Sequence, residues 1–155
     1  MRCIAALLTV IPLAAAGCGS SDEVTPAACL AGPDAYARAL RSAPGAVVLA
    51  GNTPISSCLT KNQSAGELTT VGAALVTTAT RLNAEARGER GADAAVRLGY
   101  LIGAAQSGAE DTSGIHANLL GRLEAAAGFS PGGEGLPPGV SAAYDRGVAA
   151  GRTGG

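Results

Sequence analysis

The stretch SAGELTTVGAALVTTATRLNAEAR (64–87) carries the clearest structural signal in the chain. Ser64 and Glu67 have the S-x-x-E spacing of a capping box, in which each side chain bonds the backbone N–H of the other residue. After this start, apolar residues recur at intervals of three and four, which places them on one helix face. These residues are Leu68, Val71, Leu75, Ala79, Leu82 and Ala86. We therefore predict a helix over 64–87 that packs this stripe against a core.

Four other segments carry helical patterns, at 32–45, 92–110, 112–129 and 140–151. In the second of these, Gly99 and Gly103 form a G-x-x-x-G pattern, which lets two helix backbones approach closely. The alternative is a dimerising membrane helix, which the short apolar run and Arg97 disfavour. We expect close packing inside a bundle, with the helices at 64–87 and 92–110 paired as an antiparallel hairpin.

The third segment, 112–129, is expected to begin at a cap formed by Thr112 or Ser113. Its inward face would then contain four large apolar residues: Ile115, Leu119, Leu120 and Leu123. The last helix is predicted to be weak, and residues 152–155 are expected to fray.

Residues 46–61 connect the first two helices. AVVLAGN (46–52) is apolar and β-branched, but no partner strand is evident, so we predict a buried extended segment. One or two helical turns should follow, with Thr53 as the cap and Pro54 at the first helical position. The fold class that results is all-α, a small bundle of about four to five helices.

The N-terminus has the form of a secretory signal. Arg2 supplies positive charge, and IAALLTVIPLAAA (4–16) is an apolar run too short to span a bilayer comfortably. The run ends in AAGC (15–18), which resembles the lipobox of bacterial lipoproteins, with Ala15 where Leu is more usual. In that family a diacylglycerol is attached to the cysteine thiol, and the preceding segment is cut away.

The resemblance implies a signal peptide over 1–17 and a lipidated Cys18. The chain would then be exported and anchored to the outer face of the cytoplasmic membrane, or to an outer membrane if the host has one. Residues 18–27, which are small, polar and acidic, would form a flexible tether to a single domain over 28–152. The alternatives are a secreted protein cut nearby and an N-terminal anchor that is never cut.

The cysteine count agrees with an exported protein. If Cys3 leaves with the signal and Cys18 carries lipid, Cys29 and Cys58 remain, and an oxidising compartment would join them in one intrachain disulfide. A redox or nucleophilic thiol is the alternative, although the spacing is far from C-x-x-C. The net charge of −1 and the lack of a basic block argue against a nucleic-acid partner.

The sequence contains few signals for catalysis. G-x-S-x-G, S-x-x-K and a phosphate loop are all missing from it. His116, the only histidine, lies at the edge of the predicted apolar stripe, where a packed structural role is expected. The alternative is an enzyme or metal-dependent protein that uses His116 with Glu110 or Asp111. Because zinc requires three or four ligands, we expect neither a metal nor a cofactor.

The polar loop GNTPISSCLTKNQ (51–63) is the main candidate for recognition, because loops held by a rigid scaffold often carry function. We select its small polar side chains, together with the histidine of the 112–129 segment, as candidate binding residues: Asn52, Thr53, Ser56, Ser57 and His116. A structural corner is the alternative. The expected function is a non-enzymatic module that binds an envelope protein or a small ligand.

Overall fold

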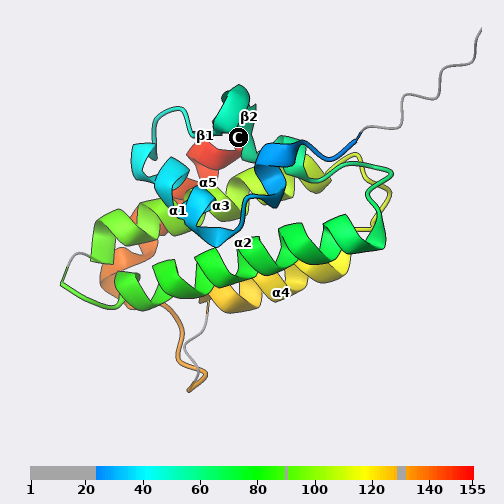
Figure 1. The fold of residues 1–155 in the computed structure, drawn as a ribbon. Helices are drawn as coiled ribbons and strands as arrows, with labels where there is room; N and C mark the ends of the chain where they lie inside the picture. The colour runs from blue at the N-terminus through cyan, green and yellow to red at the C-terminus, as the bar shows by residue number, and fades with distance from the viewer. Residues whose placement is uncertain (1–23, 90, 129–131) are drawn as a thin grey trace, which may run out of the picture.

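The structure is a computed structural model that describes residues 24–89, 91–128 and 132–155. The expected signal peptide, Cys18 and the first part of the tether lie outside these residues. Five α-helices dominate the described chain, as predicted (Figure 1): α1 (Pro33–Ala39), α2 (Ala65–Ala86), α3 (Gly91–Ala109), α4 (Ala117–Gly128) and α5 (Pro138–Gly154). Four short 3-10 helices and a two-stranded hairpin precede α2: η1 (Ala27–Leu30), η2 (Leu40–Ser42), β1 (Val48–Leu49), η3 (Ala50–Asn52), β2 (Thr53–Pro54) and η4 (Ile55–Cys58).

Helix α2 begins at the predicted capping box. The Ser64 N–H donates to Glu67 Oε2 at 3.1 Å, and the Glu67 N–H donates to Ser64 Oγ at 3.3 Å. These bonds satisfy backbone donors that a helix start otherwise leaves unpaired. The Ser64 hydroxyl also donates to Glu67 Oε2 at 2.8 Å, and this bond, with that from the Ser64 N–H, lowers the pKa of the Glu67 carboxyl. The predicted stripe is buried from the second turn onward: Val71, Leu75, Ala79, Leu82 and Ala86.

Helix α3 lies at the centre of the molecule and packs against α2, α4, α5 and η4. In Figure 1 the chain reverses direction between α2 and α3, which confirms the predicted helical hairpin, and α4 lies along α2. The segment containing α1 and the β-hairpin covers the other side of α3. Helix α3 is therefore largely enclosed, which explains why its residues from Leu98 to Ala105 are all buried.

The closest packing in the fold is between α3 and α5, which run in the same direction. A Cβ on Gly99 or Gly103 would overlap backbone carbonyls of α5, and a Cβ on Gly147 or Gly151 would overlap those of α3. The predicted close approach at Gly99 and Gly103 is thus confirmed. Its partner is a second G-x-x-x-G pattern, in α5, that the sequence analysis did not identify.

The expected start of the fourth helix is wrong. Helix α4 begins at Ala117, and residues 111–116 form turns in which Ser113 has φ of 54° and Gly114 has φ of 82°. These left-handed conformations are incompatible with a continuous right-handed helix. As a result Ile115, which was predicted to face inward, is 42% exposed, and His116 precedes the helix instead of lying on it.

The connection between α1 and α2 also differs from the prediction. Val48 and Leu49 pair antiparallel with Pro54 and Thr53, so the extended segment does have a partner strand. Thr53 does not cap a helix, because it lies in β2 and its hydroxyl donates to the Ala50 carbonyl. The 3-10 turn η4 begins later, at Ile55.

Both ends of the folded body extend further than expected. Thr25, assigned to the tether, is buried and bonded to Gln63. At the other end α5 continues to Gly154 instead of fraying, and the Arg152 guanidinium donates to Gln106 Oε1 on α3 at 2.7 Å.

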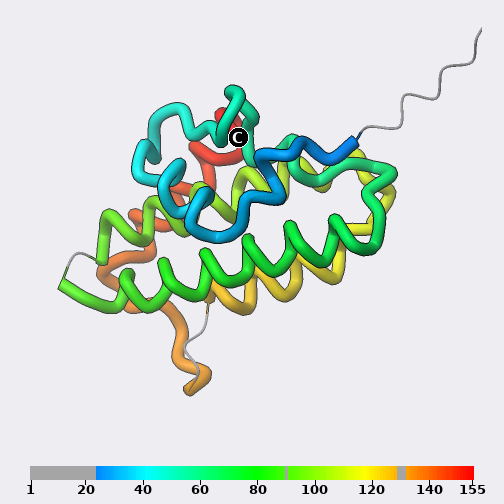
Figure 2. Tube along the Cα trace, viewed as in Figure 1, coloured from blue at the N-terminus to red at the C-terminus, as the bar shows by residue number. Residues whose placement is uncertain are grey.

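The predicted disulfide between Cys29 and Cys58 is present, with the two Cα atoms 5.4 Å apart. It joins η1 to η4, and the two chain segments lie side by side in Figure 2. The buried Tyr36 hydroxyl donates to the Cys29 carbonyl at 2.9 Å, and burial raises the pKa of this tyrosine. The N-terminal segment is therefore fastened to the body beside the loop 56–63.

Candidate ligand-binding cleft

A cleft of about 450 Å³ opens where three chain segments meet, at 24–26, 56–61 and 107–112. Its volume lies within the range of small-molecule sites. Each of the two main walls contributes hydroxyl groups, from loop 56–61 and from the end of α3 with the turn after it: Ser56, Ser57, Thr60, Ser107 and Thr112.

Gly108 allows these two walls to meet. A Cβ at this position of α3 would overlap the carbonyl oxygen of Ser56, so a larger residue would push the loop away. On the other side, the Cys29–Cys58 disulfide holds the same loop against η1. The cleft is therefore bounded by segments that are fixed on both sides, which is the arrangement expected of a preformed site.

A hydrogen-bond network centred on Gln63 supports the cleft from behind. Its Nε2 donates to Thr25 Oγ1 at 3.0 Å and to the Cys58 carbonyl at 2.9 Å. Its Oε1 lies 2.9 Å from His116 Nε2. Because that amide oxygen can only accept, this arrangement assigns the proton to Nε2 of the imidazole. Gln63 thus links the N-terminal segment, loop 56–63 and the turn before α4.

His116 is fully buried, and its burial lowers the pKa of the imidazole, which is therefore neutral at pH 7. Within the described chain, Nδ1 has no hydrogen-bond partner, and Nε2 is bonded to an amide instead of a carboxylate. Asp111 lines the cleft and Glu110 is exposed. Within the described residues, neither carboxylate forms a hydrogen bond with His116. The described residues also contain no cluster of His, Cys, Asp and Glu able to hold a metal ion.

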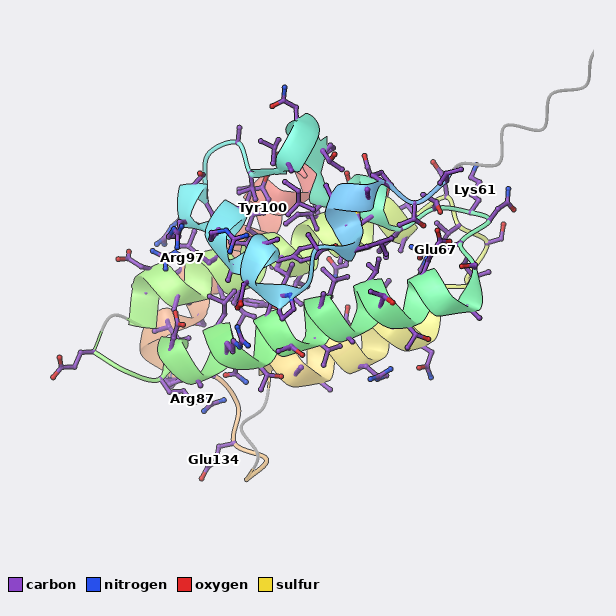
Figure 3. All side chains as sticks on the ribbon, viewed as in Figure 1. Lys61, Glu67, Arg87, Arg97, Tyr100 and Glu134 are labelled. Carbon is purple, nitrogen blue, oxygen red and sulfur yellow. A yellow bond between two sulfur atoms is a disulfide. The ribbon has the colours of Figure 1, made fainter. Side chains whose placement is uncertain are left out.

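Two charged side chains border the cleft, Lys61 from the loop and Asp111 from the turn after α3. Both are exposed, and in the described ranges neither forms an ion pair or a side-chain hydrogen bond. Figure 3 places Lys61 at the end of the molecule where the N-terminal segment lies. Both charges are thus available to a ligand.

Thr60 is the most unusual residue of the wall. It is only 8% exposed, yet its hydroxyl has no hydrogen-bond partner within the described chain. A buried hydroxyl without a partner costs about 1–3 kcal/mol, and native structures contain few of them. The wall of the cleft therefore contains a covered polar group whose removal should not cost a hydrogen bond.

Only some of the binding residues expected from the sequence line the cleft. Ser56 and Ser57 line the cleft, whereas Asn52 and Thr53 lie at the tip of the β-hairpin and do not. His116 lies behind the wall and acts on it through Gln63. The sequence analysis named the loop 51–63 without selecting Thr60, Lys61 or Gln63 within it, and it missed the contributors from other segments: Thr25, Ser107 and Thr112. Gly108 was the available signal, since a glycine inside a helix suggests a close backbone approach.

Comparisons of the chain with protein-family models, with curated proteins and with solved structures gave no match. Within the described ranges, none of the helices combines the length and hydropathy needed to cross a bilayer.

Proposed function

We propose that this protein is a lipid-anchored envelope protein whose folded domain binds a small polar ligand in the cleft. The observation that carries the proposal is the cleft itself, which is lined by hydroxyl groups from two walls and bounded by segments that Gly108 and the Cys29–Cys58 disulfide hold in place. The cleft is preformed, so binding would require little ordering of the chain. A non-enzymatic binding role accords with a histidine that is neutral, buried and bonded to an amide.

The anchor and the cleft lie close together along the chain. Six residue steps separate Cys18, in the sequence AAGC, from Val24 at the edge of the cleft. A fully extended chain of that length spans about 20 Å. If Cys18 carries lipid, the cleft is held near the membrane surface, where it would meet ligands at or close to the lipid headgroups.

The alternative function is an enzyme or metal-dependent protein that uses His116 with Glu110 or Asp111. It has less support, because the His116 ring is enclosed and bonded to Gln63. Substrate would need the loop 56–63 to open before it could reach this imidazole.

Lipid attachment is tested by growing the native host with a clickable fatty acid and comparing the wild type with Cys18→Ala. We expect label in the wild type and none in Cys18→Ala, because the thiol is the acceptor. Cys3→Ala is the matched control, since it removes a cysteine of the same N-terminal segment and should keep the label. Equal labelling of the wild type and Cys18→Ala would refute the anchor.

A further inference from the structure

We infer that the ligand of the cleft is a small zwitterion that carries one ammonium group and one anionic group. The inference rests on the proposed binding function and specifies its ligand. Lys61 and Asp111, of opposite charge, border the cleft from different segments and form no ion pair with each other. An anionic group can bind the Lys61 ammonium while an ammonium group binds the Asp111 carboxylate.

The rest of the lining agrees with this chemistry. The hydroxyls of Ser56, Ser57 and Ser107 can both donate to an anion and accept from an ammonium group. The charges of Lys61 and Asp111 cancel, so the cleft attracts a ligand with a net positive or negative charge only weakly. The lining that the structure describes has no aromatic side chain, so it offers a sugar ring no stacking surface.

The apolar part of the lining suits a short hydrocarbon connection between the two charged groups. Val24 and Pro26 line the cleft from the N-terminal segment, and Leu59 lines it from the loop. Two sources share this chemistry: a free amino acid or short peptide, and the ethanolamine phosphate headgroup of a phospholipid. The headgroup is a candidate because the proposed anchor holds the cleft near a bilayer.

The experiment uses the chain purified in nanodiscs of phosphatidylglycerol, whose headgroup carries no ammonium group, with titration calorimetry as the readout. The probes are glycylglycine, which has both charges, N-acetylglycine, which keeps only the carboxylate, and glycinamide, which keeps only the ammonium group. We expect glycylglycine to bind at least tenfold more tightly than either single-charge analogue. Nanodiscs of phosphatidylethanolamine test the second source: a headgroup in the cleft would compete with glycylglycine and weaken its binding.

Variants test whether Lys61 binds the anionic group of the ligand and Asp111 binds its ammonium group. Lys61→Gln and Asp111→Asn should each weaken glycylglycine binding about tenfold, and the double reversal Lys61→Asp with Asp111→Lys should recover it. Asp145→Asn, an exposed carboxylate on α5 outside the lining, is the matched control and should bind as the wild type does.

The outcomes separate this inference from the proposed binding function. Equal binding of N-acetylglycine and glycylglycine would overturn the zwitterion and leave the cleft as a site.

Ser57→Trp should fill the cleft, whereas Thr80→Trp on the exposed face of α2 should not. If Ser57→Trp binds glycylglycine as the wild type does, the location in the cleft is wrong. Failure of glycylglycine to bind, together with no effect of phosphatidylethanolamine on the cleft amides in nuclear magnetic resonance spectra, would overturn the inference.

Discussion

At the scale of single residues, the end of the molecule that contains the cleft has two buried polar atoms without a partner in the described chain, His116 Nδ1 and Thr60 Oγ1. They differ in kind. The imidazole keeps one hydrogen bond through Nε2, and its environment favours the neutral form. The threonine hydroxyl has no bond and lies in the wall of the cleft. The imidazole therefore predicts a pH dependence of stability, and the threonine predicts that stability rises when its hydroxyl is removed.

Stability should fall as the pH decreases below about 6.5. Burial lowers the pKa of His116 in the folded state, so the unfolded chain takes up the proton first and is stabilised relative to the fold. The loss begins at the unfolded pKa and continues down to the folded pKa. We expect the free energy of unfolding, measured in urea, to be lower at pH 5.5 than at pH 7.5. His116→Gln should remove most of this slope, since the chain has one histidine; an unchanged slope would contradict the assignment.

Thr60→Val should raise the stability of the ligand-free protein by about 1 kcal/mol. The substitution keeps the shape of the side chain and removes a buried hydroxyl that has no partner. Thr112→Val is the matched control: the Thr112 hydroxyl donates to the Ala109 carbonyl at 2.7 Å, so its loss should lower stability. Denaturant titration of both variants makes the comparison. A loss of stability in Thr60→Val would show that its hydroxyl already has a partner.

At the scale of elements, the contact between α3 and α5 depends on glycines of both helices. Each glycine costs helix stability, about 1 kcal/mol relative to alanine. That cost is offset because the backbones come into direct contact along the helices. Gly99 and Gly103 lie against the carbonyls of Tyr144 and Val148, and Gly147 and Gly151 lie against those of Val96 and Tyr100. The chain has little aromatic content, 3%, so close backbone packing replaces the burial of large side chains.

Gly103→Ala should destabilise the protein by about 1–3 kcal/mol although alanine favours helices, because the new Cβ would overlap the Val148 carbonyl. Gly121→Ala is the control. Gly121 lies inside α4 with open space around its Cα, so the same substitution should raise stability by up to about 1 kcal/mol. Thermal unfolding followed by circular dichroism measures both. Effects of the same sign in the two variants would argue against the close contact.

At the scale of the whole molecule, the Cys29–Cys58 disulfide fastens the N-terminal segment to the loop that forms one wall of the cleft. The opposite end is held differently. There the Arg87 guanidinium donates to the carbonyls of Glu134 and Gly135, at 2.9 and 3.0 Å, and so ties the end of α2 to the loop before α5 (Figure 3). The bundle is thus tied at both ends by contacts distant in sequence.

Removing the disulfide with Cys29→Ala and Cys58→Ala together should lower the free energy of unfolding by about 3.5 kcal/mol, the chain-entropy estimate for a separation of 29 residues. Because the bond also holds a wall of the cleft, hydrogen exchange at 24–30 and 55–61 should accelerate more than in α4. Uniform acceleration across the chain would mean that the bond stabilises the fold without organising the cleft.

Local patterns by themselves determined several elements of this protein. The capping box and the stripe of α2, the glycine spacing of α3 and the cysteine pair were all predicted. Each depends on residues adjacent in the helix or on the only available partner, so near neighbours suffice to specify it. The membrane anchor at Cys18 is also a prediction from local residues, and its test is chemical.

Only the tertiary structure decided which distant segments meet. Gly99 and Gly103 predicted a close contact but did not identify the partner helix, because α5 begins more than thirty residues after Gly103. The turn at Ser113 and Gly114 displaced His116 from the predicted helix, because a left-handed residue redirects the chain whatever the apolar spacing suggests. The cleft likewise combines Thr60 and Lys61 with Asp111, side chains that become neighbours only after long-range packing has been established.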